Sequence, residues 1–321
     1  MELPPALRDA VNRVLEGVPA EDLARAAAVL SQRYRAETRD GRYHVSSDLA
    51  ASAYLATRLP ATFAAVRAAM EFVTEVQPKF SPKSMLDVGA GPGTALWAAS
   101  DCWPDISTAT MVEGSAAMRN WGETLAREAG VAEIVWQGGN AAAELSKFAP
   151  HDLVTLAYVL SELSTDAQDA LVAKLWALTT DTLLIVEPGT PAGWLRILRA
   201  RDALIRAGAN IVAPCPHASA CPLTSPDWCH FARRVSRSRI HRLAKGAEVP
   251  WEDEKYIYVA VSRHAVEAPQ ARVIAPPQQA SGQVMLKLCQ SDGGYMDRRV
   301  TRREGDTYKS ARRLAWGDAV R

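Results

Sequence analysis

A glycine-rich run between an apolar strand and a helix constrains the fold of this chain more than any other feature. The run MLDVGAGPGT occupies residues 85–94, and its strand ends at Asp87. Glycine is required where a side chain would block a ligand or where φ must be positive. A loop of this kind, leading into a helix N-terminus, brings backbone N–H groups close to a ligand. We therefore expect a binding site formed by Asp87, Gly89, Ala90, Gly91 and Gly93.

Strand and helix patterns alternate from Lys83 onward. Each parallel connection needs a crossover, so this alternation implies a parallel sheet with helices on both faces. A later apolar strand at 256–262 is expected to join the sheet antiparallel. The predicted fold class is α/β with a Rossmann-like sheet. Its five parallel strands are expected at 85–88, 108–113, 133–137, 152–159 and 182–188.

The segments around this sheet divide the chain into three predicted parts. Helical patterns predict an N-terminal cap over 1–80. The sheet domain is expected over 81–265, with a cysteine-rich insertion at about 211–254. Short strand-like pieces separated by turn signals predict a small, basic, β-rich C-terminal unit over 266–321.

An acidic residue at the end of the second predicted strand favours a nucleoside ligand. Glu113 follows Asp87 by one helix and one strand, and its carboxylate can there accept hydrogen bonds from both ribose hydroxyls. The pattern here is G-x-G-x-G, whereas the dinucleotide-binding fingerprint is G-x-G-x-x-G. It resembles the first motif of class I S-adenosylmethionine-dependent methyltransferases, with an NAD-dependent oxidoreductase as the alternative. Residues after the third and fourth strands are expected to border the same cofactor: Gly138, Asn140, Tyr158 and Glu162.

No catalytic motif for methyl transfer is identifiable. Enzymes that methylate exocyclic base nitrogens usually carry an Asn/Asp-Pro-Pro-aromatic motif after the fourth strand, where this chain has AYVLSEL. The local sequence Pro214-Cys215-Pro216 superficially fits a cysteine nucleophile for cytosine-C5 methylation, but its place after the fifth strand's helix does not. We therefore leave the catalytic residues unassigned and prefer a metal-ligand role for Cys215.

Cysteines are clustered in the predicted insertion. Cys215, Cys221 and Cys229 have the spacing C-x5-C-x7-C, and Cys289 follows much further along the chain. Four thiolates can complete a tetrahedral zinc site or hold a 4Fe-4S cluster. The wide gaps favour the larger cluster, while nearby histidines keep zinc open as an alternative. The alternative without a metal is that the four cysteines are buried for unrelated reasons. The two histidines are His217 and His230.

The net charge of +1 conceals an asymmetry along the chain. Residues 1–195 contain 15 Lys+Arg and 24 Asp+Glu, whereas residues 196–321 contain 22 and 12. A basic segment of this kind favours a polyanion such as RNA, because phosphate contacts dominate affinity; a solvated basic face is the alternative. The residues expected to contact RNA are Arg233, Arg234, Arg237, Arg239, Arg298, Arg299, Arg302 and Arg303.

The chain has no sequence feature of a membrane protein. It contains no run of 18 or more apolar residues, and its start mixes acids with bases in a helical pattern. That start is unlike a signal or transit peptide. From these features we expect a cytoplasmic protein with no membrane contact. The sequence does not determine the oligomeric state, and a monomer is the expectation.

Six segments together give the chain a family resemblance: 54–66, 86–95, 185–194, 213–223, 227–231 and 256–263. With these segments it resembles the methyltransferase-like assembly factors of the mitochondrial and bacterial small ribosomal subunit. The resemblance implies S-adenosylmethionine at the glycine loop and Glu113, a 4Fe-4S cluster on the four cysteines, and association with small-subunit rRNA. A catalytically active rRNA methyltransferase and a zinc-stabilised methyltransferase of unrelated substrate stay open.

Overall fold

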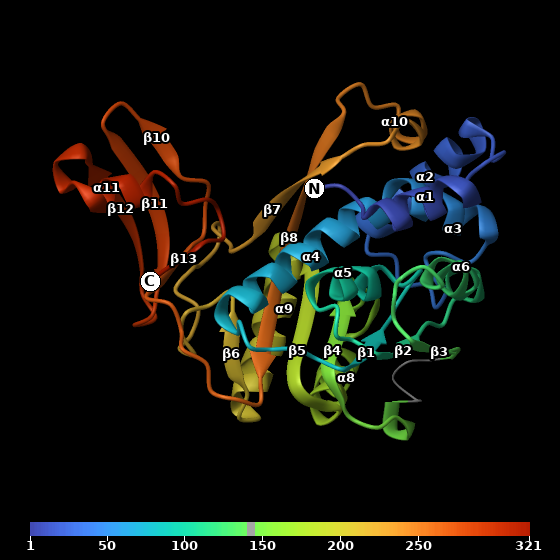
Figure 1. The fold of residues 1–321 in the computed structure, drawn as a ribbon, viewed down its shortest axis with the longest axis horizontal. Coiled ribbons are helices and arrows are strands. Elements are labelled where there is room, and N and C mark those ends of the chain that lie inside the picture. The colour runs from blue at the N-terminus through green and yellow to red at the C-terminus, as the bar shows by residue number, and fades with distance from the viewer. Residues whose placement is uncertain (140–144) are drawn as a thin grey trace.

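A mixed sheet built around the glycine-loop strand is the centre of the structure. The computed structural model describes residues 1–139 and 145–321. The order in the sheet is β3-β2-β1-β4-β5-β8-β6, and β7 pairs with β8 (Figure 1). The strands are β1 (Ser84–Val88), β2 (Thr108–Val112), β3 (Glu133–Gln137), β4 (His151–Ala157), β5 (Thr179–Pro188), β6 (Asn210–Ala213), β7 (Phe231–Ser236) and β8 (Trp251–Ser262).

Strand directions confirm the Rossmann-like prediction. The strands β1 to β5 are parallel to one another, and β8 is antiparallel to both β5 and β6. The strand β1 lies between β2 and β4, so the order of the chain reverses beside it. In open sheets of this type, ligands bind outside the carboxyl ends of the strands at such a reversal. The loop after β1 therefore occupies the position where a ligand site is expected.

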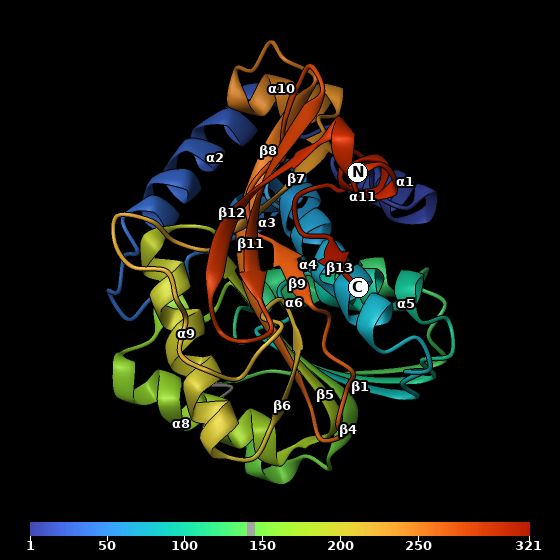
Figure 2. The ribbon, with the colours of Figure 1, turned by 90° about the vertical axis from the view of Figure 1, so that its left-hand side faces the viewer.

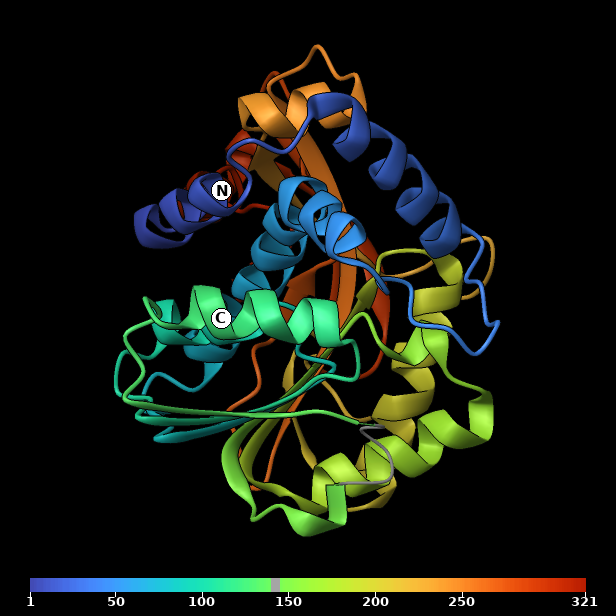
Figure 3. The same cartoon turned by 90° about the vertical axis from the view of Figure 1, so that its right-hand side faces the viewer.

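Helices cover both faces of this sheet. Figure 3 shows α5 and α6 over one face and α8 and α9 against the other. Such helices form the crossovers that parallel strands require. Two short 3-10 turns, η1 (Leu145–Lys147) and η2 (Leu160–Glu162), flank β4. The helices are α5 (Thr94–Cys102), α6 (Ala116–Ala126), α8 (Thr165–Ala177) and α9 (Pro191–Arg206).

The segment before β1 forms helices that share the core of the sheet. Pro60 separates two of them, because it fits the first turn of a helix but not its interior. The last and longest of these helices packs against α5, β7 and β8, and one continuous apolar core joins all of them. The helices are α1 (Pro5–Val14), α2 (Ala20–Arg35), α3 (Asp48–Thr57) and α4 (Leu59–Val76).

A hairpin extends from the sheet towards the N-terminal helices. The strand β8 starts at Trp251, earlier than the predicted 256, and its first half pairs with β7 outside the main sheet. Residues 251–255 alternate between exposed and half-exposed positions, as expected for a two-stranded ribbon that is not packed against a second sheet. The short helix α10 (Arg239–Lys245) connects the two strands and packs against α2 and α3.

A second sheet lies at the C-terminal end (Figure 2). The long strand β11 pairs with β12 along its whole length and with β10 and β9 on its other edge. Its apolar core is separate from that of the first sheet. The elements are β9 (Ala271–Val273), β10 (Gln278–Ala280), β11 (Gln283–Gln290), β12 (Tyr295–Thr301), η3 (Arg302–Glu304), α11 (Asp306–Ala311) and β13 (Ala319–Val320).

Candidate functional site

The three glycines after β1 all adopt positive φ. The φ angles of Gly89, Gly91 and Gly93 are 71°, 56° and 80°. A side chain at Gly89 would also collide with its surroundings, because its Cβ would lie 2.3 Å from Cγ2 of Val159. The loop therefore needs glycine both for its backbone conformation and for the close approach of the segment after β4.

Two buried polar atoms at this loop have no hydrogen-bond partner within the described residues. They are Oδ2 of Asp87 and Oγ1 of Thr94. The other oxygen of Asp87 accepts a 2.6 Å hydrogen bond from the hydroxyl of Thr155. Burial raises the pKa of Asp87 to about 7, and the charge of Glu113 adds to the rise. Buried polar groups in native proteins are normally hydrogen-bonded, so these two atoms are available to a polar ligand or water at the loop.

Glu113 holds two loops together at the carboxyl edge. Its Oε2 accepts a 2.8 Å hydrogen bond from the amide of Gly91, and its Oε1 accepts a 2.7 Å bond from the amide of Ser115. Burial raises its pKa, against the effect of these amide donors. A carboxylate has about four acceptor positions, so Glu113 retains capacity for the hydroxyls of a ribose.

The residues after β4 divide between two environments. Tyr158 has a φ of 61°, and its hydroxyl donates a 3.0 Å hydrogen bond to Glu254 on β8. Glu162 lies 3.7 Å from Nε2 of His44. Burial raises the pKa of Glu162 to about 7, and the nearby charge of Glu113 raises it further. The structure thus places Glu162 near Glu113 and ties Tyr158 to the hairpin.

The adenine side of the predicted site is only partly described. Gly138 lies against Arg119, which donates a 3.0 Å hydrogen bond to the carbonyl of Glu113. Asn140 lies outside the described residues. Trp136 packs over Gly122 and approaches Gly93. No sequence motif marks Trp136, because its position depends on the pairing of β3 with β2.

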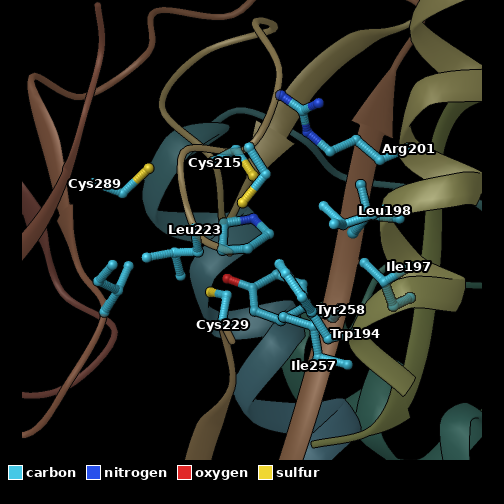
Figure 4. Close-up of a pocket in the computed structure, with 14 residues that line it drawn as sticks. Trp194, Ile197, Leu198, Arg201, Cys215, Leu223, Cys229, Ile257, Tyr258 and Cys289 are labelled. Carbon is cyan, nitrogen blue, oxygen red and sulfur yellow. The ribbon is translucent and has the colours of Figure 1, made fainter. Parts of the chain in front are cut away.

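Four thiols from two sheets line one pocket (Figure 4). Cys215, Cys221 and Cys229 come from the segment between β6 and β7, and Cys289 comes from β11. Its other walls include Trp194, Arg201 and Tyr258. Within residues 1–139 and 145–321, no group of three or more His, Cys, Asp or Glu side chains is arranged to hold a metal ion. The predicted metal site is therefore a shared pocket of thiols, and a preformed ion site is not shown.

Burial disfavours the charged form of all four thiols and raises their pKa values. Burial raises the pKa of Cys289 to about 12 and the pKa of Cys229 well above its usual range. The charges of Cys215 and Cys221 add to the rise in both pKa values, after burial. A cation in the pocket would reverse these shifts, because metal-bound thiols are deprotonated.

The two histidines proposed as zinc ligands have different surroundings. Nε2 of His217 lies 3.3 Å from Sγ of Cys289, at the edge of the pocket. The ring of His230 stacks on Trp228 at a centroid distance of 5.1 Å and meets Trp316 edge-on. His217 is therefore adjacent to the thiols, whereas His230 belongs to an aromatic cluster.

Arginines on the hairpin are paired with acids across the ribbon. Arg234 forms a two-point contact with Asp253 at 2.9 and 3.0 Å and lies over the ring of Trp251. Arg237 lies 2.9 Å from Glu252. A third hairpin arginine, Arg233, pairs with Glu71 on α4. These predicted RNA contacts are partly neutralised by the acids that pair with them.

Several arginines near the C-terminus have fewer acidic partners. Arg298 lies 3.7 Å from Glu304, a loose contact between exposed side chains. No ion pair forms with the remaining arginines of the predicted RNA set across the described ranges. These are Arg239, Arg299, Arg302 and Arg303.

The strand order and the glycine loop define a class I methyltransferase-like protein. Residues 48–321 match the family described as "Mitochondrial small ribosomal subunit Rsm22", and the chain belongs to that family. The resemblance predicted from the cysteine segment and its neighbours is confirmed by this match.

Two relatives extend the comparison. The human "Ribosome assembly protein METTL17, mitochondrial" is 31% identical over 285 residues, which cover 83% of this chain and 61% of that protein. The "Rsm22-cox11 tandem protein 2, mitochondrial" of Schizosaccharomyces pombe is 24% identical over 325 residues, covering 83% and 42%. The chain thus spans less than two thirds of the length of either relative.

One solved structure that resembles this chain is that of an O-methyltransferase family protein from Burkholderia thailandensis. It is 12% identical, with a TM-score of 0.46 and coverage of 74% of this chain and 68% of that one. A putative RNA methyltransferase from Pyrococcus horikoshii is 14% identical, with a TM-score of 0.40 and coverage of 61% and 81%. Similarity at this level says nothing about activity.

The expected cytoplasmic location is wrong. The family and both relatives are described as mitochondrial, which points to mitochondria. The expectation rested on the lack of a long apolar run and on a start unlike a signal or transit peptide. Among the helices of the described ranges, none has the length and apolar character needed to cross a membrane.

Proposed function

We propose that this chain binds S-adenosylmethionine and a 4Fe-4S cluster and acts on the small ribosomal subunit and its rRNA during assembly. The observation that carries the ribosomal part is the family match over residues 48–321. The name of the human relative, a ribosome assembly protein, supports the same role. The chain acts as a monomer in this proposal.

The glycine loop supports the cofactor. Asp87 and Thr94 offer buried polar atoms without partners in the described ranges, and Glu113 retains acceptor capacity beside them. Residues 87–93 would hold S-adenosylmethionine, and Glu113 would accept its ribose hydroxyls. The bound cofactor supplies an electrophilic methyl group. The surrounding residues exclude water from the loop, because Asp87 is 1% exposed and Glu113 is 9% exposed.

The thiol pocket supports a cluster over a single ion. Four sulfurs bound to one zinc ion at about 2.3 Å stand only about 3.8 Å apart. The four thiols line one pocket without forming such a compact set within the described residues. A four-iron cluster is held by four cysteine thiolates, each bound to a different iron, so its ligands stand further apart than those of one zinc ion. Cys215, Cys221, Cys229 and Cys289 would be the ligands, with zinc as the alternative.

An active rRNA methyltransferase is the second candidate. It is favoured by Glu162, whose pKa of about 7 suits a general base, and whose charge interacts with that of Glu113 at the proposed cofactor site. The first candidate instead assigns the cofactor a structural or regulatory role, in keeping with the missing catalytic motif.

Sedimentation with purified small subunits tests the ribosomal proposal. We expect the chain to co-sediment with immature subunits at low salt and to be released as salt increases, because phosphate contacts are screened. Failure to bind immature or mature subunits at any salt concentration would contradict it. Transfer of a labelled methyl group to immature rRNA, lost in Glu162→Gln, would favour the second candidate.

A further inference from the structure

Buried hydrogen-bond donors around the thiol pocket have no partner in the described part of the chain. Nε of Arg201, Nε1 of Trp194 and the hydroxyl of Tyr258 belong to residues that line the pocket. Nη2 of Arg272, just behind Cys215, is a fourth. A buried donor without an acceptor destabilises the folded state, so four around one pocket require an explanation.

Arg201 is held in place by the cysteine segment itself. Its side chain is 1% exposed, and its Nη2 donates 2.8 Å hydrogen bonds to the carbonyls of His217 and Ser219. Its carboxylate contact in the described ranges is with Asp202, which is 53% exposed. Arg201 and Cys215 line the same pocket. Arg201 is therefore fixed beside the sulfurs, with one N–H group still to satisfy.

Arg272 approaches the same segment from the second sheet. Its Nε donates a 3.0 Å hydrogen bond to the carbonyl of Pro214, the residue before Cys215. Its Nη1 contacts Glu75 at 3.1 Å and the carbonyl of Gly317 at 2.9 Å. Arg272 is thus fixed beside the residue that precedes Cys215 by contacts to three different parts of the fold, and its Nη2 has no partner in the described ranges.

Two aromatic donors complete the set. Figure 4 shows the hydroxyl of Tyr258 on the side of the pocket that holds Cys229. Trp194 lines the same pocket as Cys221, and its indole N–H is buried without a partner in the described part of the chain.

We propose that Arg201, Arg272, Trp194 and Tyr258 form a donor shell that binds the sulfur atoms of an anionic thiolate-held group. Four thiolates around a doubly charged cation or cluster core keep two negative charges. Two buried guanidinium groups and two neutral donors suit sulfur acceptors of this charge, and hydrogen bonds to sulfur stabilise such groups and set their potential. The inference rests on the metal part of the proposed function.

Tyr258→Phe is the sharpest variant, because it removes one donor and keeps the ring. Tyr256→Phe is its matched control, since Tyr256 lies on the same strand and does not line the pocket. Arg201→Gln removes the charge, and Arg201→Lys restores it without the planar fork. Each full-length variant is purified without oxygen, and the metal and sulfide per chain, the rate of metal loss to EDTA and the reduction potential are measured.

We expect Tyr258→Phe and Arg201→Gln to lose metal about tenfold faster than the unaltered protein, a typical effect of changing a group that supports a metal ligand. Their reduction potential should fall, Arg201→Lys should recover part of it, and Tyr256→Phe should match the unaltered protein. If Arg201→Gln fails to fold, Tyr258→Phe decides. If the unaltered protein holds metal and the variants lose it at the same rate and with the same reduction potential, the donor shell is overturned while the metal proposal stands. An unaltered protein without metal would remove the metal proposal and this inference together.

Discussion

Sγ of Cys289 lies 3.3 Å from Nε2 of His217, although 72 positions separate the two residues in the chain. Cys289 belongs to the second sheet and His217 to the cysteine segment that leaves the first. A second contact nearby joins Lys287 of the same strand to Asp227. The thiol pocket is therefore also the place where the two sheets meet, and a group bound there would hold them together.

Loss of one pocket cysteine should release the bound group and loosen this junction. We expect Cys221→Ser to lose more than half of the metal and to weaken RNA binding, while the first sheet keeps its fold. Metal analysis, near- and far-ultraviolet circular dichroism and RNA titration measure these effects. Cys102→Ser is the control, because Cys102 is on α5 and is not part of the pocket. Unchanged metal content, stability and RNA affinity in Cys221→Ser would exclude a role for this cysteine.

A side chain at Gly91 should abolish cofactor binding. The positive φ of 56° disfavours any other residue, and a larger side chain would meet Met118 and the expected ligand space. We expect Gly91→Leu to bind S-adenosylmethionine at least about tenfold more weakly, a loss of about 1.4 kcal/mol, by calorimetry. Gly208→Ala is the control: its φ is 81°, but no atom lies within 4 Å of the added Cβ. Equal affinity in Gly91→Leu would place the cofactor elsewhere.

Asp87 should make the stability of the ligand-free protein depend on pH. Burial raises its pKa from 3.8 to about 7, so the folded state binds a proton that the unfolded state releases. Its contribution to the free energy of unfolding is therefore greatest below pH 4 and is lost as the pH rises towards 7. Asp87→Asn should be more stable than the unaltered protein at pH 8, by up to about 4 kcal/mol, with little difference at pH 4.

Urea unfolding at the two pH values measures this difference. The asparagine oxygen still accepts a bond from Thr155, so the variant tests the charge more than the contact. Asp152→Asn serves as a control, because the pKa of Asp152 is lowered. Burial acts to raise this pKa, but hydrogen bonds from backbone amides and hydroxyl groups outweigh it. Its loss should instead reduce stability at pH 8. Equal stability of Asp87→Asn and the unaltered protein at pH 8 would show that Asp87 has no raised pKa.

Unpaired arginines should contribute more to RNA binding than paired ones. Arg302 and Arg303 lack ion pairs across the described ranges, so the variant Arg302→Gln/Arg303→Gln should weaken binding uniformly across sequences. It should also reduce the salt slope by about 1.4 to 1.8, the contribution of two phosphate contacts. The matched control is Arg234→Gln/Asp253→Asn, which removes an ion pair without changing net charge. A larger loss in the control would assign the contact surface to the hairpin.

Local spacing was sufficient to predict the sheet and its glycine loop. The alternation after residue 83 indicated the five parallel strands. The acid at the end of β1 and the glycines after it lie close together in the sequence, so the loop could be recognised from spacing alone. The pairing of Arg234 with Asp253 was not predictable, because it depends on the register of β7 against β8. His44 and Trp136 were missed for the same reason: tertiary contacts alone bring them to the carboxyl edge. The ligand roles of the predicted residues stay predictions.

The most direct test of the proposed cluster is an absorbance spectrum with iron, sulfide and zinc analysis of the full chain purified without oxygen. We expect about four irons and four sulfides per chain and a broad band near roughly 400 nm, which are typical of a thiolate-held cluster. Stoichiometric zinc without sulfide, or no metal at all, would contradict it.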